Sequence, residues 1–374
     1  MAEHLDKTEQ TLASSETPYY ALSPDVILDA VESFGVRCTG AFLALNSYEN
    51  RVYQVGIEDG APVAPGVVPP VPYRDVPMSQ EAGSRERPTL VHPGTSLVAK
   101  FYRPGRWSDE AILEEHAYTL QLAEHEIPVV PPLLGADGNT LFHYKGFRFA
   151  LFPRQGGRCP DLEDPGQREW VGRFIGRIHA VGATQIFHHR PTLTVQEFGH
   201  DAARFLLEHG FIPADLEIAY RSLVEDVLHR VSESFSRVAD VKHIRLHGDC
   251  HPGNILWTDR GPHFVDFDDC RMGPAVQDIW MLLSGERDEQ TIQLTDILEG
   301  YCDFHDFDPR DLQLIEPLRT LRMIHYSAWL ARRWQDPSFP LNFPWFNTQR
   351  YWQEQILALR EQAALLDEPP LEWR

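Results

Sequence analysis

The chain has 374 residues, a formal net charge of −21 and ordinary apolar content at 43%. This length suggests two lobes with separate cores, and the negative charge argues against a general nucleic-acid-binding protein. No apolar stretch is long enough for a membrane-spanning helix. The scattered cysteines, five in number, and the absence of an apolar signal sequence at the polar N-terminus indicate reduced thiols and a cytoplasmic location.

The N-terminal part of the chain predicts a leader followed by a small lobe. Residues 1–21 are expected to form a flexible leader, and residues 22–153 a β-rich, nucleotide-binding lobe. Ser23 precedes Pro24 and an apolar stripe. This order is typical of a capped helix start, because serine caps backbone N–H groups and proline suits the first helical position.

Three strands are predicted to follow this helix, the first two joined by a polar turn. Between the second and the third strand, residues 58–94 are rich in proline and glycine. Because such a segment cannot pair as a central strand, we expect a long insertion in the hairpin, with a docking loop for a partner as the alternative. The strands are predicted over 42–45, 51–55 and 97–102.

Helical patterns dominate the rest of the chain. Ser108 is the expected cap of an amphipathic helix that extends to Glu126. An apolar strand over 146–153 leads to a connection that corresponds to a kinase hinge, and residues 154–374 predict a large helical lobe for catalysis and acceptor binding. The fold class is therefore α+β, with a bilobal, protein-kinase-like architecture. The apolar face of the helix is predicted to consist of Ile112, Leu113, Ala117, Leu120 and Leu122.

The most informative segment contains Asp249, Asn254 and Asp266. The first two fit the pattern H-x-D-x-x-x-x-N, and two short apolar runs joined by a polar turn separate Asn254 from Asp266. Protein kinases use a base aspartate, a metal-binding asparagine and a metal-binding aspartate in this order. We therefore predict that Asp249 and Asp266 are catalytic. Asp249 orients the acceptor hydroxyl and takes its proton, while Asn254 and Asp266 hold Mg²⁺ on the phosphates of ATP.

This segment also allows other interpretations. Aspartate and asparagine beside glycine and proline often only form turns, but here the polar groups recur at kinase spacing. His247, Cys250 and His251 are possible zinc ligands, although no second Cys/His pair follows at structural-zinc spacing. A redox role for Cys250 or Cys270 is disfavoured because neighbouring carboxylates oppose a thiolate.

Three further residues are assigned supporting roles around this loop. Asp278 lies in an apolar stretch, so its carboxylate is expected to bond the catalytic loop from behind. His179 is expected to be a packing residue rather than a catalyst. Gly248 stands where protein kinases carry a phosphate-sensing arginine, which indicates activity without prior phosphorylation.

The nucleotide site is predicted around Lys100. This residue ends a Val-Ala-Lys strand between the polar turn and the amphipathic helix, the place of the lysine that reaches the α- and β-phosphates of ATP. Its partner is expected to be Glu114 or Glu115, with Glu115 preferred. The turn lacks a glycine-rich motif, so backbone N–H groups and the Ser47 hydroxyl are predicted to hold phosphate oxygens instead.

The loop HGDCHPGN and the run VDFDD resemble the aminoglycoside phosphotransferase and choline kinase superfamily, and within it the bacterial stress response kinase A family. The resemblance covers the chain from about Leu22 to Leu371, apart from the insertion. It implies a cytoplasmic serine/threonine protein kinase that protects against envelope and oxidative stress and counters stress-induced death. It also assigns the catalytic role to Asp249, the metal to Asn254 and Asp266, and nucleotide contact to Ser47. The segments that carry the closer resemblance are Leu45–Tyr53, Lys100–Pro104, Ile112–His116, Leu246–Trp257, Gly273–Asp278 and Ala328–Trp334.

The expected partners are protein substrates with serine or threonine hydroxyls, with no nucleic acid, no membrane and a monomeric state. A small-molecule kinase acting on an amino sugar, choline or homoserine is the alternative of the same fold, because a fold does not decide an acceptor. In that case Asp268 and Asp269 could line an acidic cleft. A non-catalytic nucleotide-binding regulator is disfavoured because the four residues expected in a catalytic site are all present. They are Lys100, Asp249, Asn254 and Asp266.

Overall fold

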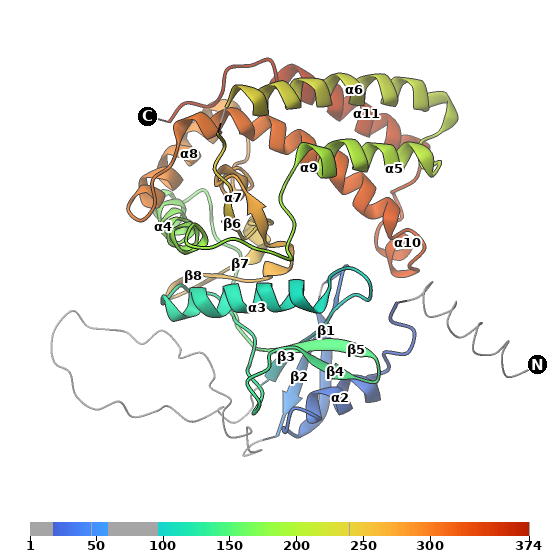
Figure 1. The fold of residues 1–374 in the computed structure, drawn as a ribbon, viewed down its shortest axis with the longest axis vertical. Helices are drawn as coiled ribbons and strands as arrows, with labels where there is room; N and C mark the ends of the chain where they lie inside the picture. The colour runs from blue at the N-terminus through green and yellow to red at the C-terminus, as the bar shows by residue number, and fades with distance from the viewer. Residues whose placement is uncertain (1–17, 46, 59–95, 239, 374) are drawn as a thin grey trace, which may run out of the picture. The chain divides into compact units, whose positions relative to one another are not determined.

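The computed structural model describes residues 18–45, 47–58, 96–238 and 240–373. Residues 1–17 of the expected leader lie outside these residues. Of the expected insertion, only Glu58 is described. The chain forms two compact units (Figure 1). The first consists of Met1–Cys159 and Ile255–Asp268, and the second of Pro160–Asn254 and Asp269–Arg374.

A five-stranded antiparallel sheet is the centre of the first unit. Its strand order is β1-β2-β3-β5-β4, so the third strand lies in the middle. Lys100, on β3, pairs with Val52 on one side and Ala150 on the other. The sequence predicted four of these strands but missed β4, which is too short to show an alternating pattern. The strands are β1 (Cys38–Leu45), β2 (Arg51–Ile57), β3 (Ser96–Phe101), β4 (Phe142–Tyr144) and β5 (Phe147–Pro153).

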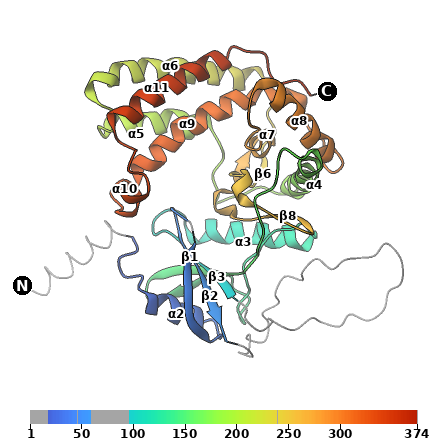
Figure 2. The same cartoon turned by 180° about the vertical axis from the view of Figure 1, so that it is seen from behind.

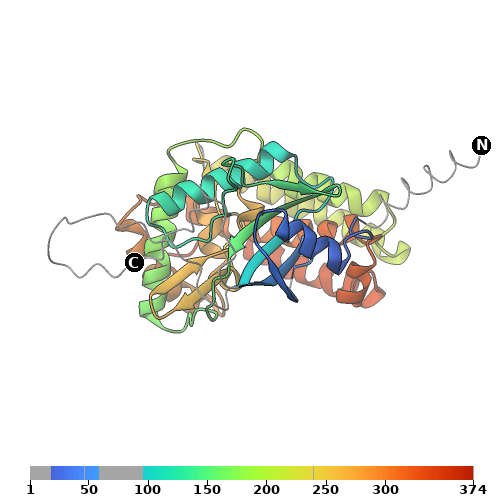
Figure 3. The ribbon, with the colours of Figure 1, turned by 90° about the horizontal axis from the view of Figure 1, so that it is seen from below.

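Helix α2 (Pro24–Glu32) packs against this sheet and closes its core (Figure 3, blue helix). The Ser23 hydroxyl accepts a hydrogen bond from the Val26 amide, which confirms the predicted cap. Ile27 and Val31 are buried together with Phe101 and other apolar side chains of the strands. The β3 backbone is thereby fixed on one side by a dry core.

Helix α3 (Asp109–Glu124) begins at the predicted cap, because the Ser108 hydroxyl accepts a hydrogen bond from the Ala111 amide. The predicted apolar face was partly wrong, since Leu113 and Ala117 are exposed. Polar side chains, among them Glu115, are buried instead. Apolar periodicity could not reveal this face, because it is held by charge pairs and hydrogen bonds as well as by apolar contact.

The hairpin of β7 (Ile255–Thr258) and β8 (Gly261–Phe264) belongs to the first unit. Its strands pair from Ile255 with Phe264 to Thr258 with Gly261, so a hairpin forms where the sequence predicted one. Bridges from Val129 to Phe264 and from Arg158 to Trp257 hold it there. The hairpin was expected in the C-terminal lobe, residues 154–374, but these two bridges attach it to the first unit.

The second unit is mostly helical. Figures 1 and 2 show α5, α6, α9 and α11 packed together as a bundle, while α4 packs on α8. The short strands β6 (Ile244–Leu246) and β9 (Arg271–Gly273) pair and frame the predicted catalytic loop. The helices are α4 (Pro165–Gly182), α5 (Ala202–Glu208), α6 (Ala214–Arg237), α7 (Val276–Trp280), α8 (Arg287–Cys302), α9 (Ile315–Arg332), α10 (Ser338–Asn342) and α11 (Gln349–Leu365). Short helical segments lie at Gln196–Asp201, Pro252–Asn254, Phe267–Asp269 and Pro309–Leu314.

Among the described residues, no helix combines the length and the apolar character needed to cross a membrane.

The Pro/Gly-rich segment 58–94 is predicted to be dispensable for folding. β2 and β3 pair as far as Gly56 and Ser96, so a short Asn-Gly turn can join their ends. Because the entropic cost of loop closure grows slowly with length, the shortened protein should keep a melting temperature within a few degrees of wild type. Thermal unfolding of both forms, with a Gly/Ser replacement of equal length as control, measures this. A fall of more than about ten degrees would show that the segment packs as structure.

Candidate active site

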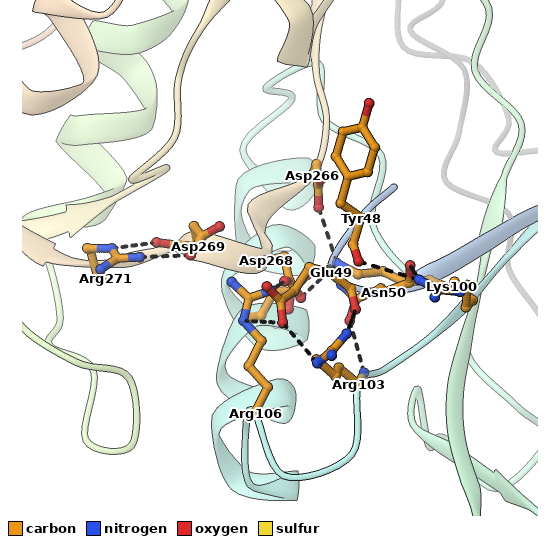
Figure 4. Close-up of polar contacts among 12 residues, drawn as sticks. Tyr48, Glu49, Asn50, Lys100, Arg103, Arg106, Asp266, Asp268, Asp269 and Arg271 are labelled. Atoms are coloured by element: carbon orange, nitrogen blue, oxygen red, sulfur yellow. Dashed lines mark hydrogen bonds and ion pairs between the residues drawn. The ribbon is translucent and has the colours of Figure 1, made fainter. Parts of the chain in front are cut away.

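Lys100 lies within a buried group of charged side chains in the first unit (Figure 4). Its Nζ atom is 3.3 Å from Oε1 of Glu115, 3.3 Å from Oδ1 of Asp266 and 3.0 Å from Oδ1 of Asp268. Burial acts to lower the pKa of Lys100, but the three carboxylates, Asp268 foremost, raise it well above its usual value. Lys100 therefore stays positively charged at neutral pH, as binding to phosphate requires.

The structure resolves which glutamate pairs with Lys100. Glu115 accepts a hydrogen bond from Nζ and is buried, whereas Glu114 is only partly buried. One residue along an α-helix rotates the side chain by about 100°, so the two glutamates cannot share a face. The preference for Glu115 is confirmed as regards the ion pair, and its part in nucleotide binding stays a prediction.

Glu49 and Asn50 fix the turn between β1 and β2 from its buried side (Figure 4). The Asn50 side-chain oxygen accepts a hydrogen bond of 3.0 Å from the Arg103 amide, and Oε1 of Glu49 lies 3.6 Å from Nε of Arg103. Arg106 lies 3.8 Å from the same Glu49 oxygen and forms an ion pair with Asp268. These contacts connect the turn to the carboxylates around Lys100.

Ser47, the predicted nucleotide contact, stands at the start of this turn and is half-buried. The buried contacts of Glu49 and Asn50 hold the turn in place, although the turn has no glycines. Contact between the Ser47 hydroxyl and a nucleotide stays a prediction.

Asp266 differs from its neighbours in both backbone and exposure. Its φ angle is +60°, in the left-handed region that costs a non-glycine residue about 1–2 kcal/mol, although aspartate tolerates it better than most. Its side chain is 55% exposed, while that of Asp268 is only 5% exposed. Backbone strain of this kind is found where a side chain must be aimed at a ligand. The backbone thus presents Asp266, and not Asp268, outward.

The suggestion that Asp268 and Asp269 line an acidic cleft was wrong for Asp268. Asp268 is buried, and Lys100 and Arg106 compensate its charge. Asp269, in the second unit, accepts a hydrogen bond of 2.8 Å from Arg271. Neither carboxylate stands as an uncompensated charge that would attract a cation.

In the second unit, Asp278 supports the catalytic loop from behind, as predicted. Its two carboxylate oxygens accept hydrogen bonds from the amides of His247, at 2.7 Å, and Gly248, at 2.8 Å. His179 is buried and places Nε2 3.1 Å from Asp278, so it supports this carboxylate and confirms the packing role. Burial acts to raise the pKa of Asp278, but the hydrogen bond and charge of His179, together with His247 and the Gly248 amide, outweigh this and lower the pKa.

Gly248 has a geometric reason to be glycine. Its φ angle is +85°, and a Cβ atom there would lie 2.2 Å from the backbone oxygen of Asp269. A side chain at this position would therefore need both an unfavourable backbone conformation and a displaced neighbouring strand. The loop has no room for the arginine that protein kinases carry at this point.

Several neighbours hold Asp249, and those named here lie in the second unit. Its Oδ1 accepts a hydrogen bond of 2.8 Å from Nη1 of Arg322, and its Oδ2 lies 3.6 Å from Nε2 of His251. The Asn254 amide group donates to the backbone oxygen of Asp249 at 2.9 Å. Arg322 was missed by the sequence analysis, because it is 73 residues away along the chain and no local motif marks it.

The thiol of Cys250 is predicted to be unreactive in the folded protein. Burial, followed by the charges of Asp278 and Asp249, raises its pKa well above the usual value, and Cys270 is buried too. Because the thiolate is the reactive form, brief alkylation at neutral pH should label exposed Cys159 at least about tenfold faster than Cys250. Mass spectrometry of native and unfolded samples measures this. Rapid native labelling of Cys250 would restore a redox role to consideration.

Among the described residues, no group of three or more histidine, cysteine, aspartate and glutamate side chains is arranged to hold a metal ion. The alternative zinc site of His247, Cys250 and His251 is therefore not formed. Nδ1 of His247 accepts a hydrogen bond from the Asp249 amide, and Nδ1 of His251 accepts one from Gly253. These imidazole nitrogens thus stabilise the turn of the loop.

Known proteins resemble this chain along most of its length. The model of the phosphotransferase enzyme family matches residues 86–315. Stress response kinase A of Escherichia coli (strain K12) is 42% identical over 359 residues, which cover 96% of this chain and 98% of that protein. Serine/threonine protein kinase RdoA of Salmonella typhimurium (strain LT2) is 40% identical over 354 residues, with coverages of 95% and 96%.

Among solved structures, amicoumacin kinase hAmiN, in complex with AMP-PNP, Ca²⁺ and Ami, aligns with a TM-score of 0.63 at 18% identity. The alignment covers 91% of this chain and 93% of that chain. It shows a common fold and confirms the predicted α+β, protein-kinase-like class. The chain is thus a phosphotransferase with a hydroxyl group as acceptor; it belongs to the phosphotransferase enzyme family and, within it, to the group of stress response kinase A.

Proposed function

We propose that the protein is an ATP- and Mg²⁺-dependent serine/threonine protein kinase. The observation that carries this proposal is the similarity along nearly the whole chain to stress response kinase A and to a relative named as a serine/threonine protein kinase. The likeness to amicoumacin kinase concerns the fold and does not decide the acceptor. A role in protection against stress-induced death, exerted in the cytoplasm, belongs to the same proposal.

Asp249 is assigned to the acceptor. Its carboxylate orients the hydroxyl and takes its proton as the oxygen bonds to the γ-phosphorus of ATP and the bond to the ADP oxygen breaks. Two features support this role. Asp278 fixes the backbone of the loop at His247 and Gly248, and Arg322 fixes one oxygen of the carboxylate itself.

Lys100 is assigned to the α- and β-phosphates of ATP, with Glu115 holding it in place. The buried ion pair between them and the raised pKa of Lys100, in which the attraction of Asp268, Glu115 and Asp266 exceeds the effect of burial, support this role. Ser47 and the backbone of its turn are assigned to phosphate oxygens, because buried contacts already fix the turn.

Asn254 and Asp266 are the residues that would hold Mg²⁺. Nδ2 of Asn254 donates to the Asp249 backbone oxygen, so its Oδ1 is the atom that would bind the ion, and Asp266 offers an exposed carboxylate. Amide and carboxylate oxygens are the hard ligands that Mg²⁺ prefers, so the donor set fits. Once bound, the ion would neutralise charge on the phosphates.

Activity without prior phosphorylation is part of the proposal. Short regular elements follow Asp266 at once: a helical turn at Phe267–Asp269, strand β9 and helix α7. They leave no long activation loop that phosphorylation could order. At Gly248, moreover, the close approach of the Asp269 backbone oxygen excludes a phosphate-sensing arginine.

The acceptor can be identified by one labelling experiment. Phosphatase-treated enzyme is incubated with γ-labelled ATP and Mg²⁺ alone, with a generic protein substrate, and with a panel of small alcohols. We expect prompt label on serine or threonine of the enzyme itself or of the added protein. Efficient turnover of a small amino alcohol with no labelled protein would replace the proposal with a small-molecule kinase.

A further inference from the structure

Arg322 contacts the aspartate that the proposed function assigns to the acceptor. Its Nη1 atom donates a 2.8 Å hydrogen bond to Oδ1 of Asp249. The side chains are 42% and 24% exposed, so a substrate can reach both. A guanidinium carries five N–H donors in a planar fork, and within the described parts of the chain this one makes a single hydrogen bond. Arg322 therefore has donors left for a second anionic group.

The helix that carries Arg322 is basic in a protein whose net charge is −21. α9 contains Arg319, Arg322 and Arg332 but only one acidic residue, Glu316, which pairs with Arg319. His325 on the same helix is neutral, because burial above all lowers its pKa to about 3. Positive charge thus remains on α9 at the turn that contacts Asp249.

Aromatic rings further along α9 do not offer a binding site for a cation. Tyr326 stacks on Trp329 with 5.7 Å between ring centres, and the guanidinium of Arg333 lies 5.2 Å from the centre of the Trp329 ring. Tyr326 and Trp329 follow Arg322 at helical spacing and share its side of the helix. A cationic acceptor would therefore meet one ring, Trp329, that already has an arginine over it, and a second, Tyr326, that stacks on Trp329.

We propose that Arg322 is a specificity-determining residue that selects a hydroxyl with a carboxylate close by, such as a serine or threonine in an acidic peptide segment. The inference rests on the role proposed for Asp249. Before the acceptor binds, Arg322 offsets the charge of Asp249. The carboxylate of the acceptor then uses the remaining N–H donors of the guanidinium, whereas an acceptor ammonium is repelled by it.

The test compares three peptides that differ only in the residues flanking one serine, which are glutamate, glutamine or lysine. Wild-type enzyme should favour the glutamate peptide over the lysine peptide in kcat/KM by roughly tenfold or more. Arg322→Gln should remove this preference chiefly by raising KM for the glutamate peptide, and Arg322→Lys should restore part of it. Arg319→Gln, one turn earlier and away from Asp249, serves as the matched control and should keep the wild-type preference.

An unchanged peptide preference in Arg322→Gln, or a wild-type preference for the lysine peptide, would overturn the inference. If the melting temperature shows that Arg322→Gln does not fold, the inference is tested with the wild-type enzyme alone. Its preference for the glutamate peptide should shrink when ionic strength rises from about 0.05 M to about 0.5 M, because salt screens exposed charges. A preference that salt leaves unchanged would contradict a role for Arg322.

The proposed protein-kinase function can fail while the inference about Arg322 holds, and a second comparison separates the two. If only small alcohols are phosphorylated, the same comparison is made with a hydroxy acid, a neutral polyol and an amino alcohol of similar size. Preference for the hydroxy acid, reduced in Arg322→Gln, would uphold the inference about Arg322. Preference for the amino alcohol would overturn it.

Discussion

Replacing Asp249 with asparagine is expected to lower kcat by roughly 10²- to 10⁴-fold, the usual effect of losing a general base. Asparagine keeps the size of the side chain, but it cannot take the proton of the acceptor hydroxyl. Binding of ATP should survive, because the proposed phosphate contacts lie at Lys100 and Ser47. Initial rates of phosphate transfer and calorimetric titration with ATP measure the two properties separately.

Asp259→Asn is the matched control for this variant. Asp259 is an exposed carboxylate in the turn between β7 and β8, and no role in catalysis is assigned to it. It should keep wild-type turnover. Turnover of Asp249→Asn within threefold of wild type would remove Asp249 from the role of base.

Replacing Asp266 with alanine is expected to abolish the effect of Mg²⁺ on ATP affinity and to lower turnover by more than about 10²-fold. The loss follows because a bound divalent ion stabilises transferring phosphate by several kcal/mol and the variant lacks a carboxylate to hold it. Removal of Asp266 also takes one carboxylate from Lys100, but Glu115 and Asp268 remain to hold it. ATP binding should therefore persist in a form that no longer responds to Mg²⁺.

Calorimetry of ATP binding with and without Mg²⁺ separates these effects, and Asp259→Asn again provides the control. Binding that depends on Mg²⁺ as strongly in Asp266→Ala as in wild type would contradict the assignment of Asp266 as a metal ligand.

Features fixed by local sequence could be predicted. The caps at Ser23 and Ser108 need only the hydroxyl and the helix that follows, and the β7–β8 hairpin needs only two apolar runs and a turn. Lys100 was recognised by its place between a turn and a helix, and the structure brings it to Glu115. The support that Asp278 gives the catalytic loop followed from the cost of burying a carboxylate without partners.

Features that depend on long-range charge pairing could not be predicted. Arg106 meets Asp268 across 162 residues of sequence, and Arg322 meets Asp249 across 73. An arginine in a helix or loop looks solvent-exposed in sequence, because nothing nearby shows which carboxylate it will meet. The buried side of α3 was misjudged because it was predicted from apolar spacing alone, whereas the polar side chains of Glu115, His116 and Thr119 are buried there as well.

Asn254 and Asp266 are proposed to bind the metal ion of a phosphotransferase whose general base is Asp249. Crystals grown with Mn²⁺ and a non-hydrolysable ATP analogue test this most directly, because Mn²⁺ can be located by anomalous scattering. We expect a metal peak about 2.0–2.3 Å from both Oδ1 of Asn254 and the carboxylate of Asp266, beside the phosphates. A metal bound instead at His247, Cys250 and His251, or by only one of the two predicted ligands, would contradict it.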